Sequence, residues 1–303
     1  MPGETHSLTD PCHFQLPVCG RVVAVRHPTG AEDLLLLEAT GDDTGLAVAL
    51  ASRLTQPVSG GDLDWRELPL SDLDAFILRL RQTVIGNRVR ADVACQAAGC
   101  ARRIDISFGI DDYLMHHKPA RPSLRGSWNI EPADESGWFR MINVRDRGNP
   151  LAVAVGESKA QSDRLGRSVD QPGPVSFRLP TVADRLATAG RRDAAEELAR
   201  RCIRPSEVAA EPRRRVESTM ELMAPSLSSD LRGVCPECGA EVVLHFDARQ
   251  FCLREFRDRA AFIYQDVDLL ARRYHWSETE ILTMPLVRRT NYAELARQEG
   301  GQW

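Results

Sequence analysis

The sequence predicts an α+β protein built from a duplicated helical module with strand–turn–strand zinc knuckles, which is zinc-ribbon-like, followed by a C-terminal helical segment. Three observations lead to this prediction. Two cysteine pairs each lie between two strands of alternating apolar residues, a run of helical segments precedes each pair, and a regular amphipathic pattern follows residue 248.

The second cysteine pair is the more specific of the two. Cys235-Pro-Glu-Cys238 is followed by Gly239 and by a strand in which Val242, Leu244 and Phe246 share one face. A tight turn of this kind directs two thiolates toward one point, and glycine supplies the positive φ that the turn requires. A structural zinc needs four ligands, so a second pair must come from elsewhere in the chain.

The first pair, Cys95 and Cys100, has four residues between its cysteines. Its flanking strands also alternate, and the apolar residues are Val89, Ala91 and Val93 on one side and Ile104, Ile106 and Phe108 on the other. If the two units pack face to face, Cys95, Cys100, Cys235 and Cys238 bind one zinc ion. The alternative is four buried thiols without a metal, since free cysteine is a common small core residue.

The order of the predicted elements occurs twice, which indicates a degenerate duplication of residues 14–115 and 177–247. Phe14-Gln-Leu-Pro and Phe177-Arg-Leu-Pro are the expected starts of the two copies. The resulting division is a flexible N-terminal arm (1–15), a first helical and zinc-knuckle module (16–118), a linker or insertion rich in Gly, Pro and Ser (119–176), a second module (177–247) and C-terminal helices (248–303).

Local patterns predict several helix boundaries. Ser71 and Thr181 are candidate N-caps, and Ser277 with Glu280 forms a capping box. Residues 248–274 carry apolar residues close to heptad spacing, which predicts one long amphipathic helix.

Composition narrows the function classes. A net charge of −4 over 303 residues argues against a dedicated nucleic-acid binder. We find no apolar window of about 18 residues, no phosphate-binding glycine loop and no nucleophile–base motif. Four thiolates would also leave zinc no open position for water, so we expect a non-enzymatic protein with a structural metal. Eight cysteines and an N-terminus without a signal peptide fit a cytoplasmic protein.

A resemblance to a known family rests on three segments. Residues 78–108 contain Leu-Arg-Gln-Thr-Val-Ile-Gly-Asn-Arg-Val before the first cysteine pair and Ile-Asp-Ile after it, residues 177–203 resemble a second leucine–proline module, and the tail reads Trp-Ser-Glu-Thr-Glu-Ile-Leu-Thr-Met-Pro-Leu-Val-Arg-Arg from Trp276. Together they resemble the T4-type bacteriophage baseplate hub and baseplate assembly proteins of phage tails and phage-like contractile injection systems. The resemblance implies a structural or assembly component of a baseplate, with other baseplate or tail subunits as partners and incorporation into a phage-like particle as an expected outcome.

The alternative function is a zinc-ribbon protein that binds nucleic acid or acts as a regulator. It requires a basic face with interleaved aromatic residues near the cysteines. Arg88, Arg90, Arg102 and Arg103 form the basic cluster there, and few aromatic residues accompany them. We therefore expect protein partners, and neither nucleic acid nor a membrane.

Overall fold

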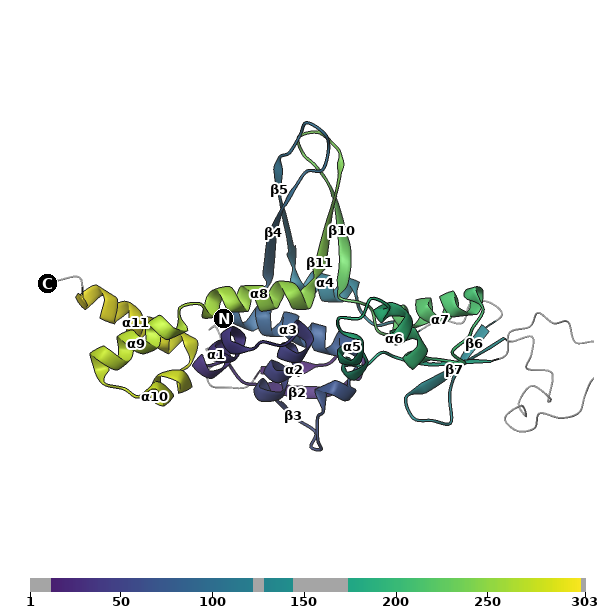
Figure 1. Cartoon of the computed structure of the whole chain (residues 1–303), viewed down its shortest axis with the longest axis horizontal. Helices are drawn as coiled ribbons and strands as arrows, with labels where there is room; N and C mark the ends of the chain where they lie inside the picture. Colours follow the sequence, from purple (N-terminus) through teal and green to yellow (C-terminus); the bar gives the residue numbers. More distant parts are fainter. Residues whose placement is uncertain (1–11, 122–127, 144–173, 301–303) are drawn as a thin grey trace, which may run out of the picture. The chain divides into compact units, whose positions relative to one another are not determined.

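The computed structural model describes residues 12–121, 128–143 and 174–300, and it is an α+β protein (Figure 1). Its strands form four separate antiparallel sheets, and its helices follow or precede them in blocks. The chain divides into two compact units: unit 1 is Met1–Lys118 with Ser226–Trp303, and unit 2 is Pro119–Pro225. The predicted fold class is confirmed.

Unit 1 begins with a three-stranded sheet and a group of helices. The sheet has the order β1–β2–β3 and consists of β1 (Cys12–Gln15), β2 (Val22–Val25) and β3 (Thr55–Pro57). The helical elements are α1 (Gly30–Glu38), α2 (Asp43–Leu54), the 3-10 helix η1 (Trp65–Glu67) and α3 (Leu70–Val84). The first cysteine hairpin, β4 (Arg88–Ala94) and β5 (Arg103–Gly109), then leads into α4 (Ile110–His116).

The second stretch of unit 1 starts with the other cysteine hairpin, β10 (Ser228–Val234) and β11 (Glu241–Asp247). Four helices follow: α8 (Ala248–Ala260), α9 (Ile263–Tyr274), α10 (Glu278–Thr283) and α11 (Leu286–Gly300).

Helix α3 is the centre of unit 1, and α8 packs along it. Phe76 and Ile77 of α3 are completely buried. Two ion pairs connect the helices: Arg249 Nη1 donates to Asp74 Oδ1 at 2.8 Å, with both residues buried, and Arg81 Nε donates to Glu255 at 2.8 Å. A buried charge is tolerated only with a well-placed partner, so these pairs fix how α8 docks on α3. Since α3 precedes β4 and α8 follows β11, the same contacts hold the bases of the two hairpins together.

The described part of unit 2 consists of a four-stranded sheet and three helices. The sheet has the order β6–β7–β8–β9 and consists of β6 (Trp128–Pro132), β7 (Trp138–Asn143), β8 (Val175–Arg178) and β9 (Ile203–Arg204). The helices are α5 (Val182–Thr188), α6 (Ala194–Cys202) and α7 (Ala210–Met223). Its core contains Met141, Val175, Phe177, Ile203 and Val216.

The order of elements occurs twice along the chain. The first copy consists of β1, β2, α1, α2, β3, α3, the hairpin β4–β5 and α4. The second copy has, in the same order, β7, β8, α5, α6, β9, α7, the hairpin β10–β11 and α8. The strand pairing also corresponds between the copies. Strand β3 pairs antiparallel with β2, and its counterpart β9 pairs antiparallel with β8. The first copy lies in unit 1, and the second begins in unit 2 and ends in unit 1.

A shared motif, Arg-x-Pro-Thr-x-x-acid, marks the same point in both copies. In the second copy, Arg178 donates to both carboxylate oxygens of Asp184 at 2.5 and 2.8 Å, and the backbone N–H of Thr181 donates to Asp184 at 3.0 Å. In the first copy, Arg26 and Thr29 make the corresponding contacts to Glu32. Each acid thus completes a capping box and pairs with the arginine at the end of the preceding strand.

This motif corrects the alignment that the sequence suggested. Phe177-Arg-Leu-Pro corresponds to Val25-Arg-His-Pro, and not to Phe14-Gln-Leu-Pro, because residues 25 and 177 both lie on the strand that leads into the capped helix. Phe14 lies one strand earlier, in β1, whose counterpart is β7. The leucine–proline similarity at Phe14 is therefore a coincidence of turn residues.

Several other boundaries differ from those expected. Residues 12–15 of the expected arm form β1, and the expected linker contains β6 and β7, because the apolar residues of 128–143 complete the sheet of unit 2. Linker residues 122–127 and 144–173 and arm residues 1–11 lie outside the described residues. The expected second module is divided between the units at residue 225, so its cysteine hairpin lies in unit 1 together with α8–α11.

Among the helix predictions, the caps at Thr181 and Ser277 are confirmed. Ser71 is not an N-cap, since α3 begins at Leu70 after Pro69. The single long helix predicted over 248–274 is two helices, α8 and α9, which are separated at Ala261 and Phe262.

The acid of the shared motif gives a prediction about stability and pH. Burial by itself raises the pKa of Asp184, but hydrogen bonds from Arg178 and Thr181 outweigh it and hold the pKa below its ordinary value. The stability that the carboxylate contributes is therefore fully present above roughly pH 4, and it is lost as the pH falls through the lowered pKa of the folded state. We expect Asp184→Asn to destabilise unit 2 by about 2 kcal/mol at pH 7, a cost below that of a fully buried pair because Arg178 is partly exposed.

Hydrogen exchange of β8 and α5 under increasing urea, at pH 7 and at pH 3, measures this difference within unit 2. The destabilisation should be clear at pH 7 and smaller at pH 3, which lies below the pKa of the carboxyl in the unfolded chain. Asp193→Asn is the matched control, because it removes an exposed pair with Arg191 and should change little. An equal effect of Asp184→Asn at both pH values would contradict the prediction.

Candidate metal centre

The two cysteine hairpins lie side by side in unit 1 and bring their turns together (Figure 1). Residues 88–94 of β4 pair antiparallel with 103–109 of β5, and residues 228–234 of β10 pair in the same way with 241–247 of β11. Along β4, β5 and β11, buried or half-buried residues alternate with exposed ones, as the sequence predicts. The predicted inward face of β11 is confirmed by the burial of Val242 and Phe246.

An aromatic cluster packs at the base of the ribbons. The rings of Phe108 on β5 and Phe246 on β11 meet edge to face at 5.1 Å, and Tyr113 of α4 lies 5.2 Å from Phe246. The Tyr113 hydroxyl donates to the carbonyl oxygen of Leu227 at 3.2 Å, just before β10. These contacts tie one hairpin to the other at the end opposite the cysteines.

The two turns share a backbone geometry despite their different lengths. The N–H of Cys95 donates to the carbonyl of Arg102 at 2.8 Å, and the N–H of Cys235 donates to that of Ala240 at the same distance. The residue after the second cysteine has positive φ in both turns, Gly239 with 73° and Ala101 with 46°. The two extra residues of the first turn are accommodated with a further positive φ of 83° at Gly99.

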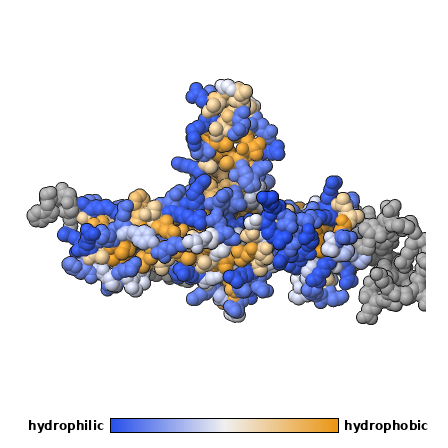
Figure 2. All heavy atoms as spheres, in the orientation of Figure 1, coloured by the Kyte–Doolittle hydropathy of each residue, from blue (hydrophilic) through white to orange (hydrophobic). Residues whose placement is uncertain are grey.

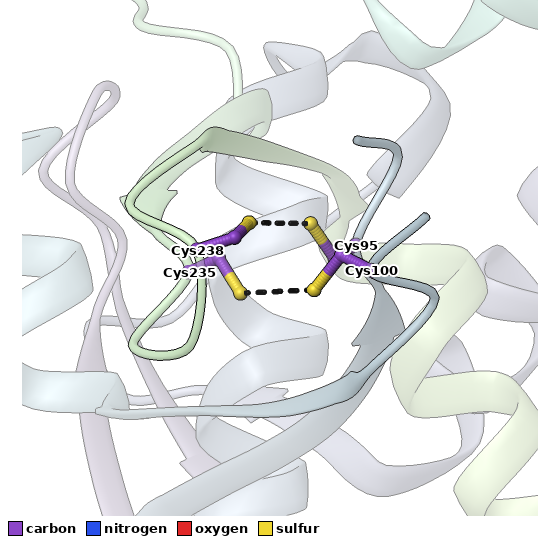
Figure 3. A group of neighbouring side chains, drawn as sticks. All are labelled: Cys95, Cys100, Cys235 and Cys238. Carbon is purple, nitrogen blue, oxygen red and sulfur yellow. Dashed lines mark hydrogen bonds between the residues drawn. The ribbon is translucent and has the colours of Figure 1, made fainter. Parts of the chain in front are cut away.

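The four sulfur atoms converge between the turns (Figure 3). Cys95 Sγ lies 3.7 Å from Cys238 Sγ, and Cys100 Sγ lies 3.9 Å from Cys235 Sγ. All four Sγ atoms lie within 4.8 Å of one another. Both short distances join a cysteine of one hairpin to a cysteine of the other, so the cluster bridges the two ribbons.

This arrangement fits a tetrahedral metal ion. Four thiolates at a Zn–S distance of about 2.3 Å would stand roughly 3.8 Å apart, which matches the two distances between the hairpins, 3.7 and 3.9 Å. The donor set consists of sulfur alone, which suits zinc and not a hard cation such as magnesium. In the part of the chain that the structure describes, these are the only Cys, His, Asp and Glu side chains that gather in a group able to hold a metal.

The surroundings favour thiolate formation at Cys235. Hydrogen bonds from the backbone N–H groups of Cys238 and Glu237 lower the pKa of the Cys235 thiol from 9.0 to about 7, although burial acts in the opposite direction. Cys95 and Cys235 are both buried. The half-buried neighbours Val93, Ala97 and Ile104 pack around them, so a metal bound here would be shielded from water on that side.

Other residues that the sequence brings to attention lie outside the cluster. Cys12, Cys19, Cys202 and Cys252 are free and are not part of it. His245 of β11 pairs with Asp230 at 2.8 Å on the exposed side of the ribbon, so it contacts no cysteine of the site. The sequence analysis did not single out Ala101. The available signal was its position directly after Cys100, which corresponds to the position of Gly239 after Cys238.

Comparison with known protein families, with curated proteins and with solved structures finds no match to this chain. Among the described residues, no helix is both long enough and apolar enough to cross a membrane.

Ala101 gives a prediction about the first turn. An L-residue in the left-handed region costs about 1–2 kcal/mol, whereas glycine adopts it freely and loses more backbone entropy on folding. We therefore expect Ala101→Gly to stabilise the protein by about 0.5 kcal/mol, and Gly239→Ala to destabilise it by about 1 kcal/mol. No atom lies within 4 Å of a Cβ added at Gly239, so only backbone strain acts there.

Urea unfolding of both variants measures these changes. Ala98→Gly is the control, since Ala98 lies in the same turn without a positive φ and should become less stable as glycine. Destabilisation of Ala101→Gly equal to that of Ala98→Gly would contradict the prediction.

Proposed function

We propose that this protein is a non-enzymatic structural or assembly component of the baseplate of a phage tail or phage-like contractile injection system, in which one structural zinc joins its two cysteine hairpins. The observation that carries the zinc proposal is the convergence of Cys95, Cys100, Cys235 and Cys238 from hairpins that lie far apart in the sequence. The baseplate assignment rests on the resemblance of the segments 78–108, 177–203 and 276–289.

The geometry supports a structural role for the metal. Four thiolate ligands complete a tetrahedral shell and leave no position for water or substrate. The ion would join the free ends of two ribbons whose bases are already held by the aromatic cluster and by α8. Because metal binding of this kind is part of the folding free energy, the hairpin pair should depend on it.

The outer surface of the hairpins supports a protein partner better than nucleic acid. Figure 2 shows hydrophobic residues on the hairpin pair. Val234 of β10 and Val243 of β11 are large apolar residues exposed there. Arg103 pairs with Asp92 and Arg232 with Glu241 on the ribbons, whereas Arg88, Arg90 and Arg102 form no ion pair with a residue that the structure describes. Over residues 88–109 and 228–247 five arginines are interspersed with six acidic residues, so the hairpin pair carries no excess of positive charge for phosphate groups.

Zinc content tests the metal proposal. We expect one zinc per chain by elemental analysis, lost in both Cys95→Ser and Cys235→Ser, with a lower melting temperature in each variant. Cys12→Ser is the matched control, because Cys12 is an exposed cysteine outside the cluster and should retain the metal. Zinc lost with Cys235 but retained without Cys95 would contradict a shared site, and a cooperative, unchanged melt of Cys235→Ser would contradict a structural one.

Particle assembly tests the baseplate proposal. Deleting the gene for this protein from a cluster that encodes a phage-like tail should abolish or sharply reduce complete baseplates in electron micrographs of sedimented particles. Expressing the Cys235→Ser variant in the deletion strain should fail to restore them. The Cys12→Ser variant should restore them. Normal particle yield without the protein, or tight salt-resistant binding of the purified chain to duplex DNA or RNA, would favour the regulatory alternative.

A further inference from the structure

Unit 1 contains a cavity that shares no lining residue with the metal site. Its volume is about 570 Å³, within the range of ligand-binding pockets. The apolar wall is formed by buried residues of α1, α2, α3 and α8, which include Leu36, Leu54, Leu80 and Phe256. The opposite wall is the segment from Pro285 to Leu295, which begins just before α11.

The apolar lining continues onto exposed residues of α11. Val287 and Leu295 are 54% and 49% exposed, and Asn291 lies between them on the same face at a spacing of four residues. Eight residues of helix span about 12 Å. A large apolar residue at each end of that length, beside an apolar cavity, is typical of a surface that another chain covers.

The charge available at the cavity is positive. Its two carboxylates are already engaged, because Glu32 pairs with Arg26 and Asp33 pairs with Arg289. Arg259 and Arg288 also line the cavity and are exposed, and neither forms a hydrogen bond or ion pair with any residue that the structure describes. The positive charge of Arg259 also favours the charged form of Asp33. An occupant with an apolar face and acidic flanks would complement both features.

The α11 wall is held in place without an occupant. Arg289 is 1% exposed and pairs with Asp33 of α1 and, at 3.5 Å, with Asp266 of α9. Gly30 makes room for it, since a Cβ there would lie 2.7 Å from Arg289 Nη1. Thr29 also forms a β-bridge with Pro285. The cavity is therefore preformed, which lowers the ordering cost of binding.

We propose that this cavity binds an amphipathic helical segment of a partner protein, with its apolar side chains between α3, α8 and α11 and its acidic residues beside Arg259 and Arg288. Helices commonly dock in such grooves through apolar anchors at i, i+3 or i+4, and i+7. The inference rests on the proposed function for the class of partner, a baseplate or tail subunit. It adds the chemistry of the segment of that subunit that binds.

The test uses the full-length, zinc-loaded protein and a displayed library of helical peptides. Selection should enrich peptides with apolar residues at helical spacing and flanking Asp or Glu. The affinity of the most enriched labelled peptide is then measured by fluorescence anisotropy. Leu295→Asp and Arg288→Glu should each weaken binding at least tenfold, and replacing the acids of the peptide by lysine should do the same.

Matched controls are Val243→Asp on the hairpin and Arg254→Glu on α8, which change an exposed valine and an exposed arginine away from the cavity. Both should bind the peptide as the wild type does. Zinc content and melting temperature should be unchanged in Leu295→Asp and Arg288→Glu, because both positions are exposed.

Three results would overturn the inference: enriched peptides that bind Leu295→Asp as well as the wild type, stoichiometric binding of dodecanoate in the absence of any Leu295-dependent peptide, or dimerisation of the chain that Leu295→Asp abolishes. The first indicates another surface, the second a small amphiphile and the third a second copy as the occupant. Leu295-dependent peptide binding in a protein that tail assembly does not require would contradict the baseplate proposal alone, so the two failures are distinguishable.

Discussion

The constraint on which this structure depends is that two separate β-hairpins must stand face to face. A two-stranded ribbon is marginally stable in water, because one face of it has nothing to pack against. Here each ribbon supplies the missing layer for the other, yet residues along the middle of their shared face, such as Ile106 and Leu244, are only half-buried. The contact therefore relies on its two ends, the aromatic cluster at Phe108 and Phe246 and the four thiols at the turns.

The duplication explains how these ends come together. Each copy of the module supplies one hairpin with two cysteines, and neither copy alone has enough ligands for a structural zinc. The chain passes through all of unit 2 between the two hairpins, so the pairing is non-local. The buried pair of Arg249 with Asp74 then fixes the second hairpin to α3, which carries the first.

The two copies share the contacts within each module, and they differ in the helices that follow the cysteine hairpin. The arginine-to-acid capping motif is retained at Glu32 and Asp184, because it joins a strand to the helix that follows it in each sheet. Helices α4 and α8 occupy the same position in the two copies, but α4 ends at His116, whereas α8 continues to Ala260 and packs on the core. Helix α11, which follows α8 in the second copy, forms one wall of the cavity beside Arg259, and the described residues of the first copy include no counterpart of α11.

The sequence by itself determined the features that depend on local periodicity and spacing. The strand alternation around Cys95 and Cys235, the N-cap at Thr181, the capping box at Ser277 and the α+β class can all be derived from neighbouring residues, because side-chain direction follows the strand or helix period. The tertiary structure decided what depends on distant contacts: that β6 and β7 complete a sheet, that the chain divides at residue 225, and that α8 ends at Ala260. The sequence predicted that Cys95, Cys100, Cys235 and Cys238 meet if the two hairpins pack face to face. The tertiary structure decided that they do, with their sulfur atoms within 4.8 Å of one another, because that distance is set by packing between the ribbons and not by the spacing within either turn.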